Sequence, residues 1–109
     1  MLPIDLRIAH LHVRIHCDSG DCEAGIEALT RLFSRHDPEG KPDLDFSFKH
    51  AGNGTLLSCN NEHLWQGEEA GEVIAAFEWA FYNRSIALLH PRFISLHAAT
   101  VNWQGYSIT

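Results

Sequence analysis

The stretch LDFSFKHAGNGTLLSC, residues 44–59, decides the fold. In its first half the apolar Leu44, Phe46 and Phe48 alternate with polar residues, a period of two that is typical of a β-strand with one buried face. The sequence AGNG then supplies a turn, and a second run follows at residues 55–59. The stretch therefore predicts a β-hairpin, and with it a sheet around which the rest of the chain is arranged.

A second segment with a period of two covers residues 7–17. From residue 9 its odd positions are apolar and its even positions are polar, which predicts one strand with a single wet face. The apolar positions from residue 9 onward are Ala9, Leu11, Val13 and Ile15, and the polar ones are His10, His12, Arg14 and His16. The sequence CDSGDC then supplies turn and cap residues for a helix predicted over 21–36. The apolar stripe of this helix is Cys22, Ile26, Leu29 and Phe33.

The next part of the chain predicts a short strand and a long helix. Residues 64–65 are a short apolar stretch compatible with another strand, and the helix is expected over about residues 68–89, with an acidic start that suits the helix dipole. Its apolar stripe is Ala70, Val73, Ile74, Phe77, Ala80, Phe81 and Leu88. Arg84 falls within this stripe, so it must either snorkel to solvent or pair with a carboxylate.

Together these elements predict an α+β fold, a mixed sheet with two helices that ends in a hairpin. Pro91 stops the long helix, and the terminal hairpin turns at residues 104–105. We divide the chain into an N-terminal α+β region, residues 1–66, and a second region, residues 67–109, which holds the long helix and the hairpin. With 109 residues and 45% hydrophobic content, the chain has the length and composition for one core.

The composition argues against several functional classes. Eight Lys and Arg against fourteen Asp and Glu give a formal net charge of −6 without a basic run, which argues against nucleic-acid binding. The most apolar window, residues 73–89, contains Glu78, Asn83 and Arg84, so it predicts a packed helix and not a membrane span. The first ten residues lack the pattern of a signal peptide, and the three cysteines lack paired spacing. We therefore expect reduced thiols in a cytoplasmic protein.

The segment LHAATVNWQGYSIT, residues 96–109, resembles the entry to the nucleotide site in the HPr kinase/phosphorylase superfamily, especially the HPr-kinase-related kinases. In that family a strand with a His-Ala-Ala-like motif turns through a short loop into a second strand, and the phosphate-binding loop follows. The matching residues are Leu96, His97, Ala98, Ala99, Val101, Gly105, Ile108 and Thr109. The preceding helix, rich in Trp and Phe, also resembles its counterpart in the family, so roughly the last forty residues carry the resemblance.

The resemblance implies a kinase whose catalytic part lies beyond these residues. The complete enzyme would transfer a phosphoryl group from ATP, with Mg²⁺, to a protein or peptide serine. The terminal hairpin would be the first hairpin of its P-loop domain, and the preceding lobe would supply sheet, packing and acceptor recognition. The nearest string to a phosphate-binding loop, GDCEAGIE at residues 20–27, has Ile26 and Glu27 where Lys and Ser or Thr are needed. We therefore expect no catalytic residue, no cofactor site and no kinase activity in this chain alone.

Histidines offer the remaining candidate chemistry. His10, His12 and His16 can face one side of the predicted strand, and imidazole is a common metal ligand. Since His16 lies roughly 13 Å from His12 at about 3.3 Å per residue, only His10 and His12 are close enough to share an ion. The competing interpretation is a polar strand face. We interpret His97 as a hydrogen-bonded structural residue and not as a catalytic one.

Two functions of different classes stay open at this point. The first is the N-terminal segment of an HPr-kinase-related kinase, with the remainder of its own kinase domain and a protein or peptide acceptor as partners. In that case Arg84 would form an internal ion pair that positions the helix against the nucleotide-binding core, unless the last helical turn is frayed. The second is a self-contained cytosolic interaction module whose last strand closes its own sheet or pairs with a second copy. A metal-binding protein is a third, minor possibility.

Overall fold

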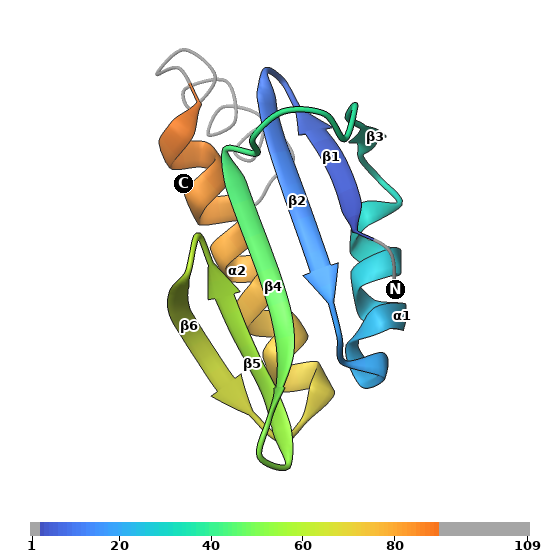
Figure 1. Cartoon of the computed structure of the whole chain (residues 1–109), viewed down its shortest axis with the longest axis vertical. Coiled ribbons are helices and arrows are strands. Elements are labelled where there is room, and N and C mark those ends of the chain that lie inside the picture. The colour runs from blue at the N-terminus through green and yellow to red at the C-terminus, as the bar shows by residue number, and fades with distance from the viewer. Residues whose placement is uncertain (1–2, 90–109) are drawn as a thin grey trace, which may run out of the picture.

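The computed structural model describes residues 3–89, which form one mixed sheet and two helices (Figure 1). The elements, in chain order, are β1 (Ile4–Ile8), β2 (Leu11–Cys17), α1 (Gly20–Thr30), β3 (Ser34–Arg35), β4 (Leu44–Ala51), β5 (Gly54–Cys59), β6 (Glu62–Gly67) and α2 (Ala70–Leu88). The predicted α+β class, with a mixed sheet and two helices, is confirmed.

The six strands lie in the order β3-β1-β2-β4-β5-β6. β1 and β2 form an antiparallel hairpin, and β4, β5 and β6 form an antiparallel meander. The two parts join where β2 pairs in parallel with β4, a connection that passes through α1 and β3. The hairpin predicted over residues 44–59 and the extra strand at residues 64–65 are both confirmed.

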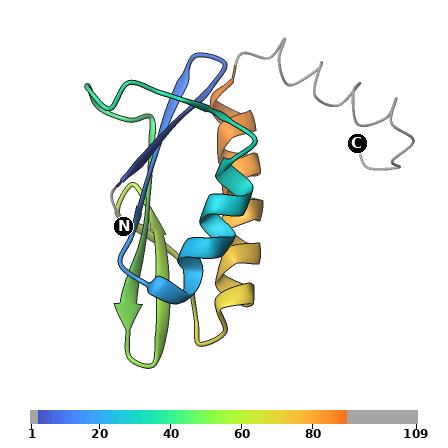
Figure 2. The same cartoon turned by 90° about the vertical axis from the view of Figure 1, so that its right-hand side faces the viewer.

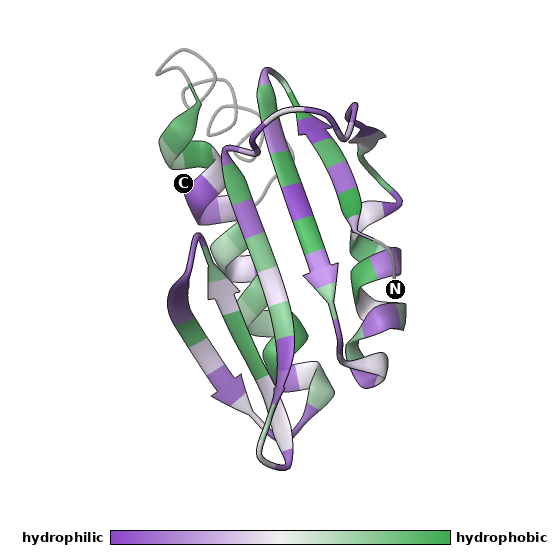
Figure 3. Cartoon of the chain, viewed as in Figure 1, coloured by the Kyte–Doolittle hydropathy of each residue, from purple (hydrophilic) through white to green (hydrophobic). Residues whose placement is uncertain are grey.

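Both helices cover the same face of the sheet, and within residues 3–89 no helix lies on its other face (Figure 2). Hydropathy alternates along β1, β2 and β4 (Figure 3). Since successive side chains of a strand point to opposite faces, the apolar ones turn toward the helices, which explains this arrangement. Phe46 and Phe48 of β4 pack against Phe77 of α2, each with 5.1 Å between ring centroids, and all three are fully buried. The sheet and α2 therefore share one core.

Gly25 lies where the two helices touch. A Cβ atom at this position would sit 2.9 Å from Ile74 Cγ1 of α2, closer than packed carbon atoms approach one another. A glycine inside a helix is normally unfavourable. Here it lets α1 approach α2 closely, which accounts for its place in the middle of α1.

The prediction of a single strand over residues 7–17 is wrong. The chain reverses at Ala9 and His10, so β1 ends at Ile8 and β2 begins at Leu11. Ala9 adopts φ = 53°, a left-handed conformation that a tight turn needs and that is uncommon for alanine. Ala9 belongs to the odd-numbered apolar positions that continue into β2, whereas the apolar positions of β1, Ile4, Leu6 and Ile8, are even-numbered. The change of phase between Ile8 and Ala9 is the signal of the turn in the sequence.

The first helix is shorter than predicted. It ends at Thr30 and not near His36, and the Thr30 hydroxyl donates a hydrogen bond to the Ile26 carbonyl within its last turn. Residues 34–35 then form β3, which pairs with β1. The long helix is confirmed as α2, although Leu88, placed in its buried stripe by the sequence, is 48% exposed.

The terminal hairpin lies outside the described residues, as do the motif residues Leu96, His97, Ala98, Ala99 and Gly105. Within residues 3–89, neither helix combines the length and the apolar character that crossing a membrane requires.

Candidate functional site

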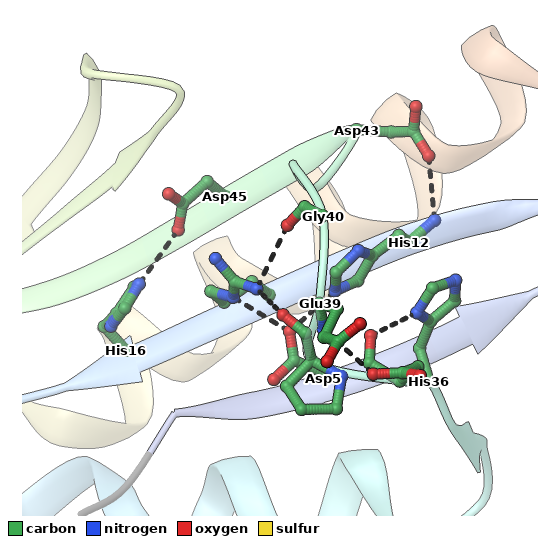
Figure 4. A network of polar contacts seen from close by, with 11 residues as sticks. Asp5, His12, His16, His36, Glu39, Gly40, Asp43 and Asp45 are labelled. Atoms are coloured by element: carbon green, nitrogen blue, oxygen red, sulfur yellow. Dashed lines mark hydrogen bonds and ion pairs between the residues drawn. The ribbon is translucent and has the colours of Figure 1, made fainter.

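The helix-free face of the sheet carries a network of polar side chains beneath a crossing segment. We use "crossing segment" for residues 36–43, which follow β3 and pass over this face on the way to β4. The segment runs over β2 beside Asp5 and His12 (Figure 4). Polar residues gather here because the outward positions of the strands face away from the helices.

Asp5 is the centre of the network. Its Oδ1 atom accepts hydrogen bonds from His12 Nε2 at 2.6 Å and from Arg14 Nε at 2.8 Å. The hairpin register explains the contact, since Asp5 lies directly opposite Arg14 and diagonally opposite His12 on the same face. Asp5 and His12 are buried and Arg14 is 21% exposed, so the bonds are largely shielded from water.

Burial disfavours the charged form of Asp5, but the hydrogen bonds from His12 and Arg14 and the Arg14 charge outweigh that effect. The pKa of Asp5 is therefore lowered from its ordinary value. Asp5 is ionised at neutral pH, which makes His12 Nε2 the donor of their hydrogen bond.

His36 attaches the start of the crossing segment to this network. Its ring stacks on the His12 ring with 4.0 Å between centroids and 4° between planes. Its backbone N–H donates to the Asp5 carbonyl at 2.9 Å, and its Nδ1 atom lies 2.6 Å from the Asp37 carbonyl oxygen. His36 is thus fixed by both its ring and its backbone.

Arg14 and Asp43 fix the rest of the crossing segment. Arg14 Nη2 donates to the Pro38 carbonyl at 2.5 Å and more weakly to the Gly40 carbonyl at 3.4 Å. At the far end, the His12 N–H donates to Asp43 Oδ2 and the Asp43 N–H donates to the His12 carbonyl, both at 2.8 Å. The segment is therefore bound at its start, middle and end.

A polar hollow of about 680 Å³ opens on this face, between the end of the crossing segment and the β5–β6 turn. Its lining is His16, Asp18, Lys41, Pro42, Asp43, Asp45, Ser47, Lys49, Asn60 and Asn61. Three carboxylates, two ammonium groups, an imidazole, a hydroxyl and two amides thus face one space. Such a lining can hydrogen-bond a ligand that carries both donors and acceptors.

Asp45 has unused hydrogen-bonding capacity in the hollow. Its Oδ1 atom lies 3.3 Å from His16 Nε2, close enough for an ion pair. The atom itself is buried, and within residues 3–89 it has no hydrogen-bond partner. Buried acceptors are normally satisfied, and His16 Nε2 is the donor placed nearest to this atom.

Asn60 gives the hollow a rigid wall. The Asp45 N–H donates to Asn60 Oδ1 at 2.8 Å, and the Asn60 N–H donates to the Asp45 carbonyl at 2.9 Å. Asn60 and Asn61 have φ values of 50° and 69°, a left-handed turn that asparagine tolerates better than most residues. The turn therefore holds the start of β4 in place.

The metal-site candidates are not brought together as the sequence indicated. His10 is exposed in the β1–β2 turn, whereas His12 is buried and bound to Asp5. His16 instead pairs with Asp45. In the part of the chain that the structure describes, no three His, Cys, Asp or Glu side chains are arranged to hold a metal ion.

Arg84 pairs with a carboxylate, one of the two outcomes that its place in the apolar stripe predicted. Its Nη2 atom pairs with Glu62 Oε1, which joins α2 to β6. The Glu62 side chain is 63% exposed, so this is a surface pair and not an internal one. Such pairs contribute little stability.

The three cysteines are free and buried. Burial raises the pKa of the Cys17 and Cys59 thiols, which keeps both protonated at neutral pH. The expectation of reduced thiols agrees with this arrangement.

Sequence reasoning missed Asp5, His36 and Asp43. Asp5 was overlooked because β1 was not recognised as a strand, although Ile4, Leu6 and Ile8 alternate with polar residues. That alternation and a turn at residues 9–10 would have placed Asp5 opposite Arg14.

Compared with known proteins, the chain matches no family model, no curated protein and no solved structure.

Proposed function

We propose that the chain is the N-terminal lobe of an HPr-kinase-related kinase, which recognises the phosphoryl acceptor and performs no catalysis itself. The observation that carries the proposal is the segment LHAATVNWQGYSIT, residues 96–109, which in that family leads into the phosphate-binding loop. The segment follows closely after α2, which ends at Leu88. ATP and Mg²⁺ would bind to the remainder of the kinase domain.

The polar hollow supports a recognition role for the lobe. Its volume of about 680 Å³ falls within the range of small-molecule and peptide-side-chain sites. Lys41, Lys49 and Asn60 offer donors, while Asp43 and Asp45 offer acceptors. A serine-containing peptide with polar flanking residues has complementary groups. The proposed compartment is the cytoplasm, where ATP is available and free cysteines stay reduced.

A kinase assay on the product of the complete reading frame tests the proposal. With ATP and Mg²⁺ we expect phosphate transfer to a serine in a peptide library, and no transfer by the 109-residue chain alone. Absence of transfer by the complete product, or transfer by the chain alone, would contradict the proposal.

Substitutions in the hollow test the recognition role separately. For Lys49→Ala in the complete product, we expect the KM for the acceptor peptide to rise about tenfold. This rise corresponds to the loss of one charge-assisted hydrogen bond, which contributes about 1.5 kcal/mol to binding. The KM for ATP should not change. Leu32→Ala is the matched control, because Leu32 is 81% exposed and does not line the hollow. A larger effect on ATP than on the peptide would argue against acceptor binding here.

An interaction module is the second candidate, and the edge position of β6 in the described sheet favours it. β6 is the last strand of the described sheet, and such an edge can pair with another chain. In that case the purified chain should form a stable dimer in size-exclusion chromatography with light scattering. A monomer at all accessible concentrations would remove the self-pairing form of this candidate.

A further inference from the structure

An apolar groove lies between β6 and α2, away from the polar hollow. Its volume is about 500 Å³, and its walls include Leu64, Trp65, Ala75, Ala76 and Trp79. Trp79 is 70% exposed and Trp65 is 46% exposed. Two indole rings left open to water beside one apolar hollow are unusual on a protein surface, and they mark a place where something docks.

The chain itself supplies an occupant close by. Twenty residues follow those described by the structure, and they include Phe93, Ile94, Leu96, Val101, Trp103 and Ile108. Trp79 lies nine residues before the end of α2, about 14 Å along the helix at 1.5 Å per residue. An extended chain covers that distance in four or five residues, at about 3.3 Å each. A segment that turns back after Leu89 therefore reaches the groove with residues to spare.

The elements that form the groove carry more acidic than basic residues. Five glutamates lie on β6, on α2 and on the connection between them, Glu62, Glu68, Glu69, Glu72 and Glu78, and of these Glu72 lines the groove together with Arg84. Arg84 at one end already pairs with Glu62, and Glu72 accepts a hydrogen bond from Trp65 Nε1 at 3.0 Å. Residues 90–109 contain Arg92 and two histidines but no Asp, Glu or Lys. The excess of acidic residues on the elements that form the groove favours such a segment.

A segment of the same chain also has an advantage over a separate partner. A tethered segment acts at an effective concentration in the millimolar range, so a small groove suffices to hold it. A stable complex of two chains needs roughly 1,200 Å² or more of total buried surface. We propose that residues 93–101 of the same chain dock in the groove formed by Trp65, Ala76 and Trp79. This inference concerns the 109-residue chain and needs no kinase activity, although residues 96–101 also belong to the segment on which the proposed kinase rests. The docking is therefore tested by NMR on the chain itself, and the kinase by phosphate transfer.

Paramagnetic NMR on the full 109-residue chain tests the docking. A nitroxide label is attached to Ser95→Cys under native conditions, where the buried native thiols are shielded, and labelled wild-type chain serves as the background. We expect the indole N–H signals of Trp65 and Trp79 to lose most of their intensity, and to regain it when the label is reduced. The Leu32 amide should keep its intensity. Unchanged indole signals would overturn the proposal.

Two further samples separate the possible occupants. In a mixture of labelled ¹⁴N chain and unlabelled ¹⁵N chain, docking within one chain leaves the indole signals intact, whereas broadening there would show that a second copy fills the groove and would overturn the proposal. Trp79→Glu in the labelled chain should restore the Trp65 signal, while Leu32→Glu should not. Trp79 is largely exposed, so its substitution should spare the fold, and unchanged amide signals of β2 and β4 check this.

Discussion

Replacing Asp5 with alanine should destabilise the protein by about 3 kcal/mol. Asp5 accepts one hydrogen bond from His12 and one from Arg14, and a hydrogen bond to a charged group contributes about 1.5–3 kcal/mol. Arg14 is 21% exposed and keeps its bond to Pro38, so we take the lower value for each bond. Asp5→Asn keeps an acceptor but loses the charge, and should cost about half as much.

Urea unfolding followed by circular dichroism measures this change. With an m value of about 2 kcal/mol/M, the Asp5→Ala midpoint should fall by about 1.5 M without a change in m. Asp18→Ala is the matched control, an exposed carboxylate on the same face, and it should alter stability by less than about 0.5 kcal/mol. If Asp5→Ala lowered the free energy of unfolding as little as the control does, the view that Asp5 holds the network together would be refuted.

Three further predictions concern pH, thiols and helix packing. Because the pKa of Asp5 is lower in the folded state than its unfolded value of about 3.9, its contribution to stability is present above that value and is lost as the pH falls through the folded pKa. Thermal melts should therefore show that Asp5→Asn loses less stability than the wild type as the pH is lowered below about 3.9. Cys17 and Cys59 should react with a thiol reagent at least about 100-fold more slowly in the native chain than in urea, and equal rates would contradict their burial. Gly25→Leu should cost about 1–3 kcal/mol by forcing the helices apart, whereas Gly71→Ala, where no atom lies within 4 Å of the added Cβ, should stabilise by roughly 0.5–1 kcal/mol in the same denaturation assay.

The parts of the fold that follow from local patterns were predictable. The Leu44, Phe46 and Phe48 alternation identifies β4, and the turn after it identifies the hairpin with β5. The spacing of Val73, Phe77 and Phe81 identifies the buried side of α2. In each case the hydrophobic period and the secondary structure agree, so tertiary contacts do not need to be known.

The errors arose where a periodic pattern was extended past the end of an element. The alternation changes phase between Ile8 and Ala9, at a turn that contains no glycine or proline, and two strands were taken for one. Phe33 continues the helical stripe beyond Thr30, although the chain there has left the helix and is about to pair with β1. Both outcomes depend on β1, a strand whose pairing partners lie on either side of it in the sheet.

The candidate site was harder to predict from the sequence than the fold. The Asp5 contact with Arg14 follows from the β1–β2 register, which requires the turn to be placed correctly. The stacking of His36 on His12 also requires the path of the crossing segment, which no periodic pattern encodes. The hollow around Asp45 joins residues from β2, β4 and two turns, so it appears only once the sheet order is known.

Reading the coding DNA for a few hundred bases past Thr109 tests the central claim most directly. If the chain is the N-terminal lobe of an HPr-kinase-related kinase, a Gly-rich segment ending in Gly-Lys-Ser or Gly-Lys-Thr should follow in frame within about ten residues. An in-frame stop codon directly after Thr109 would contradict the claim and leave an interaction module as the better account.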